Sequence, residues 1–173
     1  MQRFYVDQAG ACLGSFDGPR AASPFGGTAV AVAPEDAAAQ RWNGTAWVWP
    51  PEILRERKLA AIGKRYQQAL QDGVRYGDKL LQLRLEDQVN LTAMGNEARW
   101  AGALATPWPP DFAWRMADDS FLKVPTAEAM IALAQAAQAE IHRLQRVKWT
   151  HSDAVRALTR ADEIAAYDIE SGW

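Results

Sequence analysis

The order of apolar and polar positions predicts a turn-rich β region at the start of the chain. Residues 3–6 and 11–16 are β-prone runs, and Gly10 between them can supply the positive φ of a hairpin turn. From residue 20 to residue 40 the sequence is rich in Ala, Pro, Gly and Ser, and only residues 29–33 resemble a strand. We therefore expect an extended segment that needs a neighbour for its order.

A second hairpin is predicted where three tryptophans gather. Asn43-Gly44 is a preferred two-residue hairpin turn, and it would pair Trp42 with Thr45. Because side chains of a strand alternate between its two faces, three indoles should share one face of this hairpin. They are those of Trp42, Trp47 and Trp49.

Apolar residues then recur every three or four positions, which is the helical period. This spacing predicts a helix over 51–71 and a less regular one over 86–104, with Asp87 as the candidate N-cap and with Val89 and Leu91 on its apolar side. Gly-containing and Asp-containing turns predict β-hairpins near 74–83 and 112–124.

The longest predicted helix covers residues 127–148, with Thr126 as its cap. A further helical stretch is expected to restart near Thr150 or Ser152. The apolar positions of the long helix step by threes and fours, as in coiled coils, which predicts a homo-oligomer with a trimer favoured. The residues expected to carry oligomerisation are Met130, Ala134, Ala137, Ile141 and Leu144.

Together these elements predict an α+β fold in two regions. Residues 1–50 form a β-hairpin-rich, extended docking region that contains the Trp hairpin. Residues 51–173 form a small helix and hairpin domain with a long C-terminal helix.

Composition and charge narrow the classes of partner. The chain has 173 residues, of which 49% are hydrophobic, and a formal net charge of -2. This charge gives no basic field for nucleic acid or an anionic membrane, and charges interrupt every apolar run before it reaches membrane-spanning length. The single Cys12 excludes an internal disulfide. We expect a soluble protein, made in the cytoplasm, whose partners are proteins or neutral ligands.

Residue patterns that carry catalysis are missing from the sequence. It has neither a nucleophile elbow nor a phosphate-binding glycine pattern. The two histidines, His142 and His151, are nine positions apart, on opposite sides of a continuous helix, and we expect both in solvent rather than on a metal. Asp118-Asp119 fits a turn better than an acid pair. The sequence therefore predicts no enzyme, no metal site and no cofactor.

The eight tryptophans are the unusual feature of the composition. Two interpretations of the Trp hairpin are open. In the favoured one, aromatic side chains pack on the chain itself or on a partner protein, as aromatic anchors do at interfaces. In the other, the indoles form a stacking platform for a glycan. The residues expected to bind a partner are Trp42, Trp47, Trp49 and Phe25.

Five segments follow one another in an order that suggests a family. They are Asp72-Gly73 at the end of a charged helix, Val74–Asp78, Leu85–Leu91, Trp114–Asp119 and Glu128–Ala134. In this order, the region from about residue 51 to 173 resembles a family of uncharacterised domains encoded in the tail modules of tailed bacteriophages, where they occur in tail fibre, tail tip and fibre-assembly proteins.

The resemblance implies a non-enzymatic structural or adaptor protein of a phage tail. Such a protein would dock to other tail proteins and would reside in the virion tail after synthesis in the host cytoplasm. Two alternatives are a fibre-assembly chaperone that is absent from the mature virion and a receptor module that binds a host surface glycan through the tryptophans.

Overall fold

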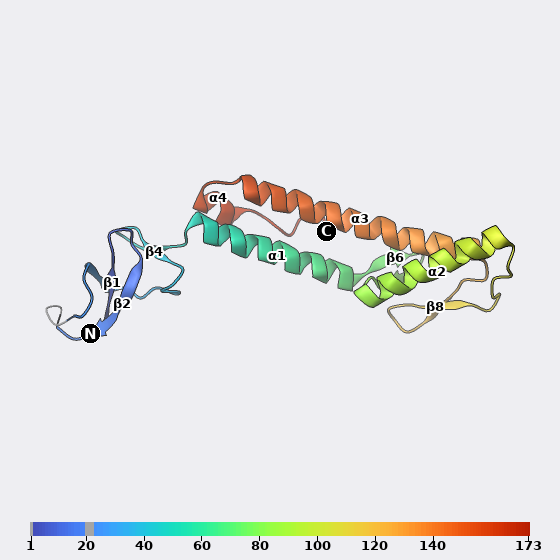
Figure 1. Cartoon of the computed structure of the whole chain (residues 1–173), viewed down its shortest axis with the longest axis horizontal. Helices are drawn as coiled ribbons and strands as arrows, with labels where there is room; N and C mark the ends of the chain where they lie inside the picture. Colours follow the sequence, from blue (N-terminus) through green and yellow to red (C-terminus); the bar gives the residue numbers. More distant parts are fainter. Residues whose placement is uncertain (1, 20–22) are drawn as a thin grey trace. The chain divides into compact units, whose positions relative to one another are not determined.

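The computed structural model describes residues 2–19 and 23–173 and has an α+β fold, as the sequence predicts (Figure 1). Four helices and four small antiparallel sheets make up these parts of the chain. Residues 20–22, at the start of the expected extended segment, lie outside the described residues.

The chain forms two compact units, each built from two stretches of sequence. Unit 1 consists of Met1–Ala60 and Val155–Tyr167, and unit 2 of Ala61–Ala154 and Asp168–Trp173. The division therefore does not fall at residue 50. In unit 1 the Arg55 guanidinium donates to the carbonyl of Leu158 at 2.9 Å, and the Lys58 ammonium donates to the carbonyls of Ala165 and Tyr167 at 3.0 and 2.8 Å. These bonds tie the first turns of helix α1 to the later stretch of the same unit.

Unit 1 begins with a three-stranded antiparallel sheet in the order β2-β1-β3. Its strands are β1 (Gln2–Val6), β2 (Cys12–Asp17) and β3 (Thr28–Val30). Gly10 has a φ of 78° in the first turn, as expected. Tyr5, Val6 and Val30 are buried, so the segment after residue 22 obtains its order by adding a strand to the first hairpin. A separate hairpin consists of β4 (Arg41–Trp42) and β5 (Trp47–Val48).

Helices α1 (Pro51–Asp72) and α3 (Ala127–Ala157) each contribute to both units. Helix α3 is continuous, so the restart expected near Thr150 or Ser152 is wrong. No Gly or Pro lies between Lys148 and Ala157 to interrupt the helix. The last helix is α4 (Ala161–Ala166), in unit 1.

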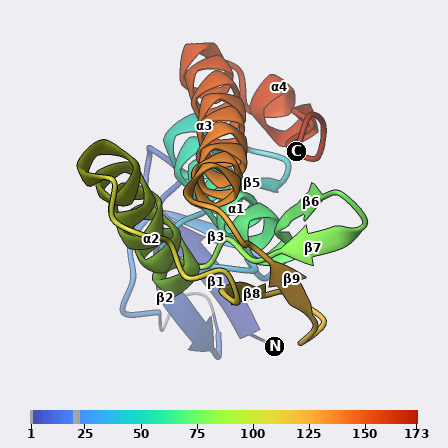
Figure 2. The ribbon, with the colours of Figure 1, turned by 90° about the vertical axis from the view of Figure 1, so that its right-hand side faces the viewer.

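Unit 2 adds helix α2 (Leu85–Leu104) and the two predicted hairpins. Their strands are β6 (Val74–Tyr76) with β7 (Lys79–Leu81) and β8 (Ala113–Arg115) with β9 (Phe121–Lys123). The two hairpins lie next to each other (Figure 2). They are linked by the Ala117 N–H, which donates to Leu80 O at 2.9 Å, and by the Lys79 ammonium, which donates to the Ser120 hydroxyl at 2.7 Å.

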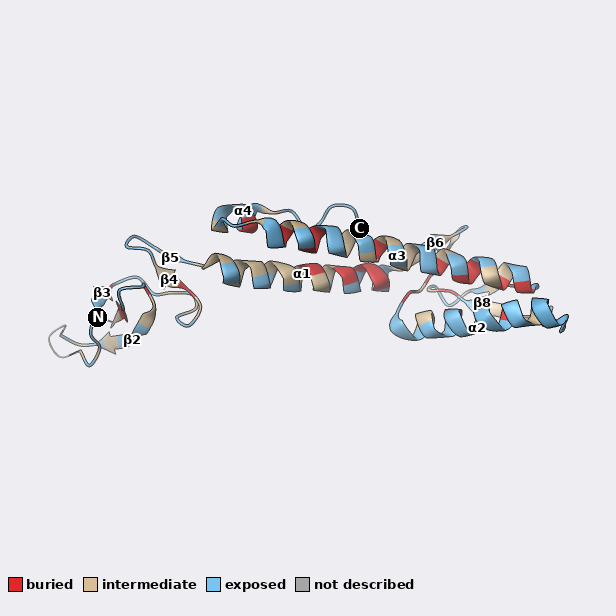
Figure 3. Cartoon of the chain, turned by 45° about the horizontal axis from the view of Figure 1, so that its top comes forward, coloured by how far each residue is buried: buried red, intermediate tan, exposed pale blue. Residues whose placement is uncertain are grey.

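The core of unit 2 is built from α1, α2, α3 and both hairpins. Met130 and Leu133 of α3 are fully buried in it together with Leu81 and Leu83. Gly95 of α2 lies so close to α3 that a methyl group in its place would be 2.7 Å from the Cβ of Ala134. Burial follows the apolar faces of α1 and α3, whereas α2 is mostly exposed (Figure 3).

Candidate partner-binding surfaces

The Trp hairpin of unit 1 has a wider loop than the sequence predicts. Trp42 pairs with Trp47, which leaves residues 43–46 in the loop, so the predicted pairing of Trp42 with Thr45 is wrong. The Asn43 side chain causes the difference, because its carbonyl oxygen accepts from the backbone N–H groups of Thr45 and Ala46 at 3.0 and 2.9 Å. An Asn that bonds to the following backbone stabilises this larger loop.

The three indoles make contacts inside unit 1. The rings of Trp42 and Trp47 meet edge to face with centroids 5.7 Å apart, and the Trp47 indole N–H donates to Val32 O at 2.8 Å. Trp49 lies beyond the strand, and the Arg57 guanidinium sits 3.6 Å from the centroid of its ring. All three side chains are half-buried, and the rings of Trp42 and Trp47 stand at 65° to each other instead of sharing one flat plane.

Phe25, the fourth residue expected to bind a partner, packs against the sheet. Its ring centroid is 5.9 Å from that of Tyr5, and it covers the backbone of Gly14, where a Cβ atom would collide with the ring. Phe25 therefore helps to close the small core of unit 1.

The apolar stripe of α3 also packs inside the chain. Met130, Ala134, Ala137 and Leu144 are buried in the core of unit 2, and Ile141 is half-buried against it. The expected oligomerisation stripe thus faces the chain's own core, because an amphipathic helix buries its apolar face on the nearest elements of its domain. These residues do not form a free surface for a second copy.

Among the described residues of unit 2, four of the seven large apolar side chains that are exposed lie on α2. Leu85, Val89, Trp100 and Leu104 are 77%, 60%, 66% and 70% exposed. The predicted apolar side of this helix is only partly right, because Leu91 is buried but Val89 faces outward. Ala93 and Asn96 lie exposed between the large residues. We call these six residues the α2 face.

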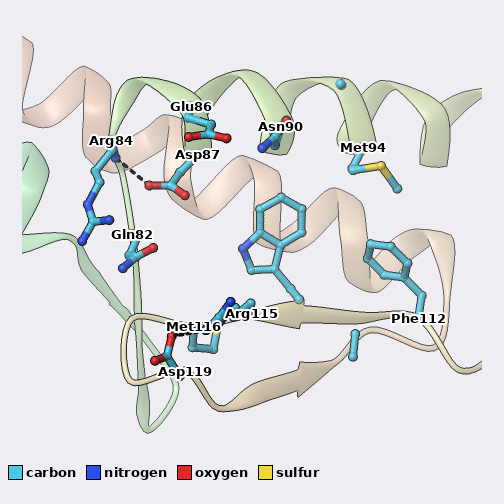
Figure 4. A pocket seen from close by; sticks show the side chains of 13 residues that line it. Gln82, Arg84, Glu86, Asp87, Asn90, Met94, Phe112, Arg115, Met116 and Asp119 are labelled. Atoms are coloured by element: carbon cyan, nitrogen blue, oxygen red, sulfur yellow. Dashed lines mark hydrogen bonds and ion pairs between the residues drawn. The ribbon is translucent and has the colours of Figure 1, made fainter.

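A groove of about 710 Å³ lies between α2 and the β8–β9 hairpin (Figure 4). Its apolar lining includes Met94, Phe112 and Trp114. Its polar lining comes from both walls and from the segment that enters α2, with Gln82, Arg84, Glu86, Asp87, Asn90, Arg115 and Asp119.

Three of the five charged side chains that line this groove, those of Asp87, Arg115 and Asp119, bond within its walls. The Arg84 backbone N–H donates to the Asp87 carboxylate at 3.0 Å, so Asp87 is not the N-cap that the sequence predicts but the third helical residue, reaching back to the cap. The Arg115 guanidinium pairs with Asp119 at 2.8 Å. Apolar and aromatic surface beside a few hydrogen-bonding groups is typical of sites for small-molecule ligands.

The turn of the β8–β9 hairpin is fixed by aspartates, as expected for Asp118-Asp119. The Asp118 carboxylate accepts from the hydroxyl and the backbone N–H of Ser120 at 2.6 and 3.1 Å, and these bonds hold the pKa of Asp118 below its usual value. Asp119 has a φ of 64°, a conformation that Asp tolerates better than most residues.

The two histidines differ in their surroundings. His142 is exposed, as expected, whereas His151 is buried, so its predicted place in solvent is wrong. The His151 ring stacks on Trp173 with centroids 5.6 Å apart, and its Nε2 is 2.9 Å from Ser171 O. A C-terminal aromatic residue folding back on the helix is a tertiary contact that helical spacing does not reveal.

Across residues 2–19 and 23–173, no three His, Cys, Asp or Glu side chains come close enough together to hold a metal ion. In the same ranges, none of the helices combines the length and the apolar character needed to cross a membrane.

Comparison with known families gives a match over most of the chain. Residues 53–171 match DUF4376, a family described as a domain of unknown function. No curated protein and no solved structure matches the chain.

Proposed function

The chain belongs to the DUF4376 family, and we propose that it is a non-enzymatic structural or adaptor component of a tailed-phage tail, associated with the tail fibre or tail tip. The phage context comes from the order of segments between residues 51 and 173, which is nearly the range that the family match covers. The family description itself names no function, so this context is our own inference.

One observation carries the structural role: the α2 face. Four large apolar side chains, each at least 60% exposed, lie on one side of this helix, and exposed apolar surface of this kind marks protein contacts. Trp100, at the centre of its C-terminal half, is the residue type most often found as an interface anchor. In our proposal this surface binds a protein, and unit 1 supplies a second contact through the exposed edges of its Trp hairpin.

The test is whether the chain is part of the particle. Phage particles are purified from the strain that encodes the chain, and their proteins are quantified by mass spectrometry against a capsid protein. A structural component should copurify at a constant ratio to the other tail proteins. A cytosolic host protein of similar abundance in the lysate serves as the control for carry-over.

Absence from purified particles would contradict the structural role. If the chain then copurifies from lysates with newly made fibre protein, the alternative of a fibre-assembly chaperone is supported. Absence from both fractions would contradict both alternatives.

A second candidate function is glycan binding, which the groove between α2 and the β8–β9 hairpin favours. The groove combines aromatic lining with amide and charged groups, whereas the indoles of unit 1 are engaged with one another and with Arg57. Sugars bind where apolar faces lie beside hydrogen-bonding groups.

This candidate is tested with the full chain on a glycan array. Asn90→Ala removes an amide that lines the groove, and Asn96→Ala removes an amide from the same helix outside it. Glycan binding at the groove predicts retention by the natural chain and by Asn96→Ala but loss by Asn90→Ala. Retention of no glycan, or equal loss in both variants, would reject it.

A further inference from the structure

We propose that the α2 face is a self-association surface, on which α2 helices from separate copies of the chain pack in parallel around a common axis, with three copies favoured. The inference rests on the structural role proposed above and names its first partner as a second copy of this chain. It differs from the sequence-based expectation in the helix that carries the contact, α2 instead of α3.

The spacing of the α2 face suits packing along the whole helix. Its six positions form three pairs, each eleven residues apart: Leu85 with Asn96, Val89 with Trp100 and Ala93 with Leu104. Eleven residues make about three turns of helix, so the surface follows the helix axis with little drift from one end to the other. A surface that stays on one side of a straight helix can meet an identical surface over its full length.

The charges beside the α2 face indicate that it binds the same face of a second copy of the chain, with the two α2 helices parallel. Each residue turns about 100° around a helix, so Glu86 and Glu97, which follow Leu85 and Asn96, lie along one edge. Arg99, which precedes Trp100, lies along the opposite edge and donates to the Asn96 side chain at 2.9 Å.

In a parallel assembly the acidic edge of each helix meets the basic edge of the next, whereas an antiparallel pair brings like edges together. Within residues 2–19 and 23–173, no ion pair involves Glu86, Glu97 or Arg99. These charges therefore remain for contacts between copies.

The width of the α2 face favours more than two copies. A two-stranded coiled coil uses a narrow seam, while a broader apolar surface fits three or four helices. The α2 face spans about 100° around the helix, from Leu85 to Leu104. Three copies give each helix two neighbours, one at its acidic edge and one at its basic edge.

The first measurement is sedimentation velocity of the full chain across micromolar concentrations. The natural chain should sediment as an oligomer, with a trimer expected. Val89→Glu or Trp100→Glu should weaken association by roughly tenfold to a hundredfold, since each places a charge where an apolar side chain would be buried. Trp149→Glu is the matched control, because Trp149 is also an exposed indole on a helix of unit 2, at 55%, but lies on α3.

The second measurement tests orientation. In a Cys12→Ser background, Ala103→Cys should form a disulfide between copies if the helices are parallel. An antiparallel pair would separate the two residues by nearly the length of the helix, about 30 Å. Glu97→Arg and Arg99→Glu should each weaken association several-fold, and the double variant should restore it.

A natural chain that stays monomeric would overturn the proposal. So would an effect of Trp149→Glu equal to that of Trp100→Glu, or an oligomer that Ala103→Cys does not cross-link. A monomer that is nevertheless present in phage particles would overturn only this inference, whereas an oligomer absent from particles would overturn only the proposed function.

Discussion

Replacing Gly95 with Ala tests the close contact between α2 and α3 on which unit 2 depends. Gly95 is buried in the middle of α2, and an added methyl group would lie 2.7 Å from the Cβ of Ala134 on α3. Real Cβ atoms do not approach other atoms so closely, so the two helices would have to move apart. Ala93 and Ala98, on the same helix, already carry methyl groups, so the backbone of α2 accepts them. A methyl group is excluded at residue 95 because α3 lies so close to it.

Two opposing effects set the magnitude. Ala is more favourable than Gly inside a helix by about 1 kcal/mol. Overpacking a core costs about 1–3 kcal/mol. Gly95→Ala should therefore lower the free energy of unfolding by up to about 2 kcal/mol, despite the better helix propensity.

Gly102→Ala is the matched control on the same helix. No atom lies within 4 Å of the position that its methyl group would take, so only the helix propensity acts and the variant should be more stable by about 1 kcal/mol. The two variants make the same chemical change, and the difference between them isolates the contact with α3.

The assay is urea unfolding followed by far-UV circular dichroism, with hydrogen exchange of the α2 amides as a local readout. The free energy of unfolding should change in opposite directions in the two variants, falling for Gly95→Ala and rising for Gly102→Ala. If Gly95→Ala proves as stable as Gly102→Ala, α2 does not pack on α3 at this distance.

Three further variants test other parts of unit 2. Met130→Ala should lower the free energy of unfolding by about 2–5 kcal/mol, because the side chain is fully buried, and urea unfolding should show this loss while sedimentation of the folded variant stays unchanged. Ala105→Gly should raise the melting temperature, with a gain of about 1 kcal/mol, because Ala105 ends α2 with a φ of 52°, a left-handed conformation that strains alanine and not glycine; an unchanged or lower melting temperature would contradict that strain. Folding lowers the pKa of Asp118, so the stability that this carboxylate contributes is present above pH 3.8, the ordinary value, and is lost as the pH falls through the folded-state pKa. Ser120→Ala should raise the pKa of Asp118 in an NMR titration, and an unchanged pKa would rule out the Ser120 bonds as the cause of the shift.

The local elements could be predicted because short-range signals determine them. Pro51 and Gly73 mark the two ends of α1, and Gly77-Asp78 marks the turn between β6 and β7, each through backbone conformations that few residue types adopt. The Thr126 hydroxyl accepts from the Ala129 N–H at 3.1 Å, which confirms it as the cap of α3.

The candidate surfaces were less predictable, because they depend on which apolar residues the fold buries in its core. The stripe from Met130 to Leu144 and the row from Leu85 to Leu104 have similar helical spacing in the sequence. Only the packing of α3 among α1, α2 and the hairpins shows that the first is core and the second is surface. Likewise, nothing in the residues around Trp173 or His151 indicates that Trp173 folds back to stack on His151.

The sequence by itself determined the α+β class, the helices and hairpins with their approximate bounds, and the resemblance of residues 51–173 to a domain family. These follow from hydrophobic period, turn chemistry and residue order, which act over a few neighbouring positions. Tertiary structure alone decided how the chain divides into two units, how wide the Trp loop is and which apolar faces are buried. It also decided that residue 95 must be glycine. These features depend on distances between segments far apart in the chain, and the order of residues in a sequence contains no information about such distances.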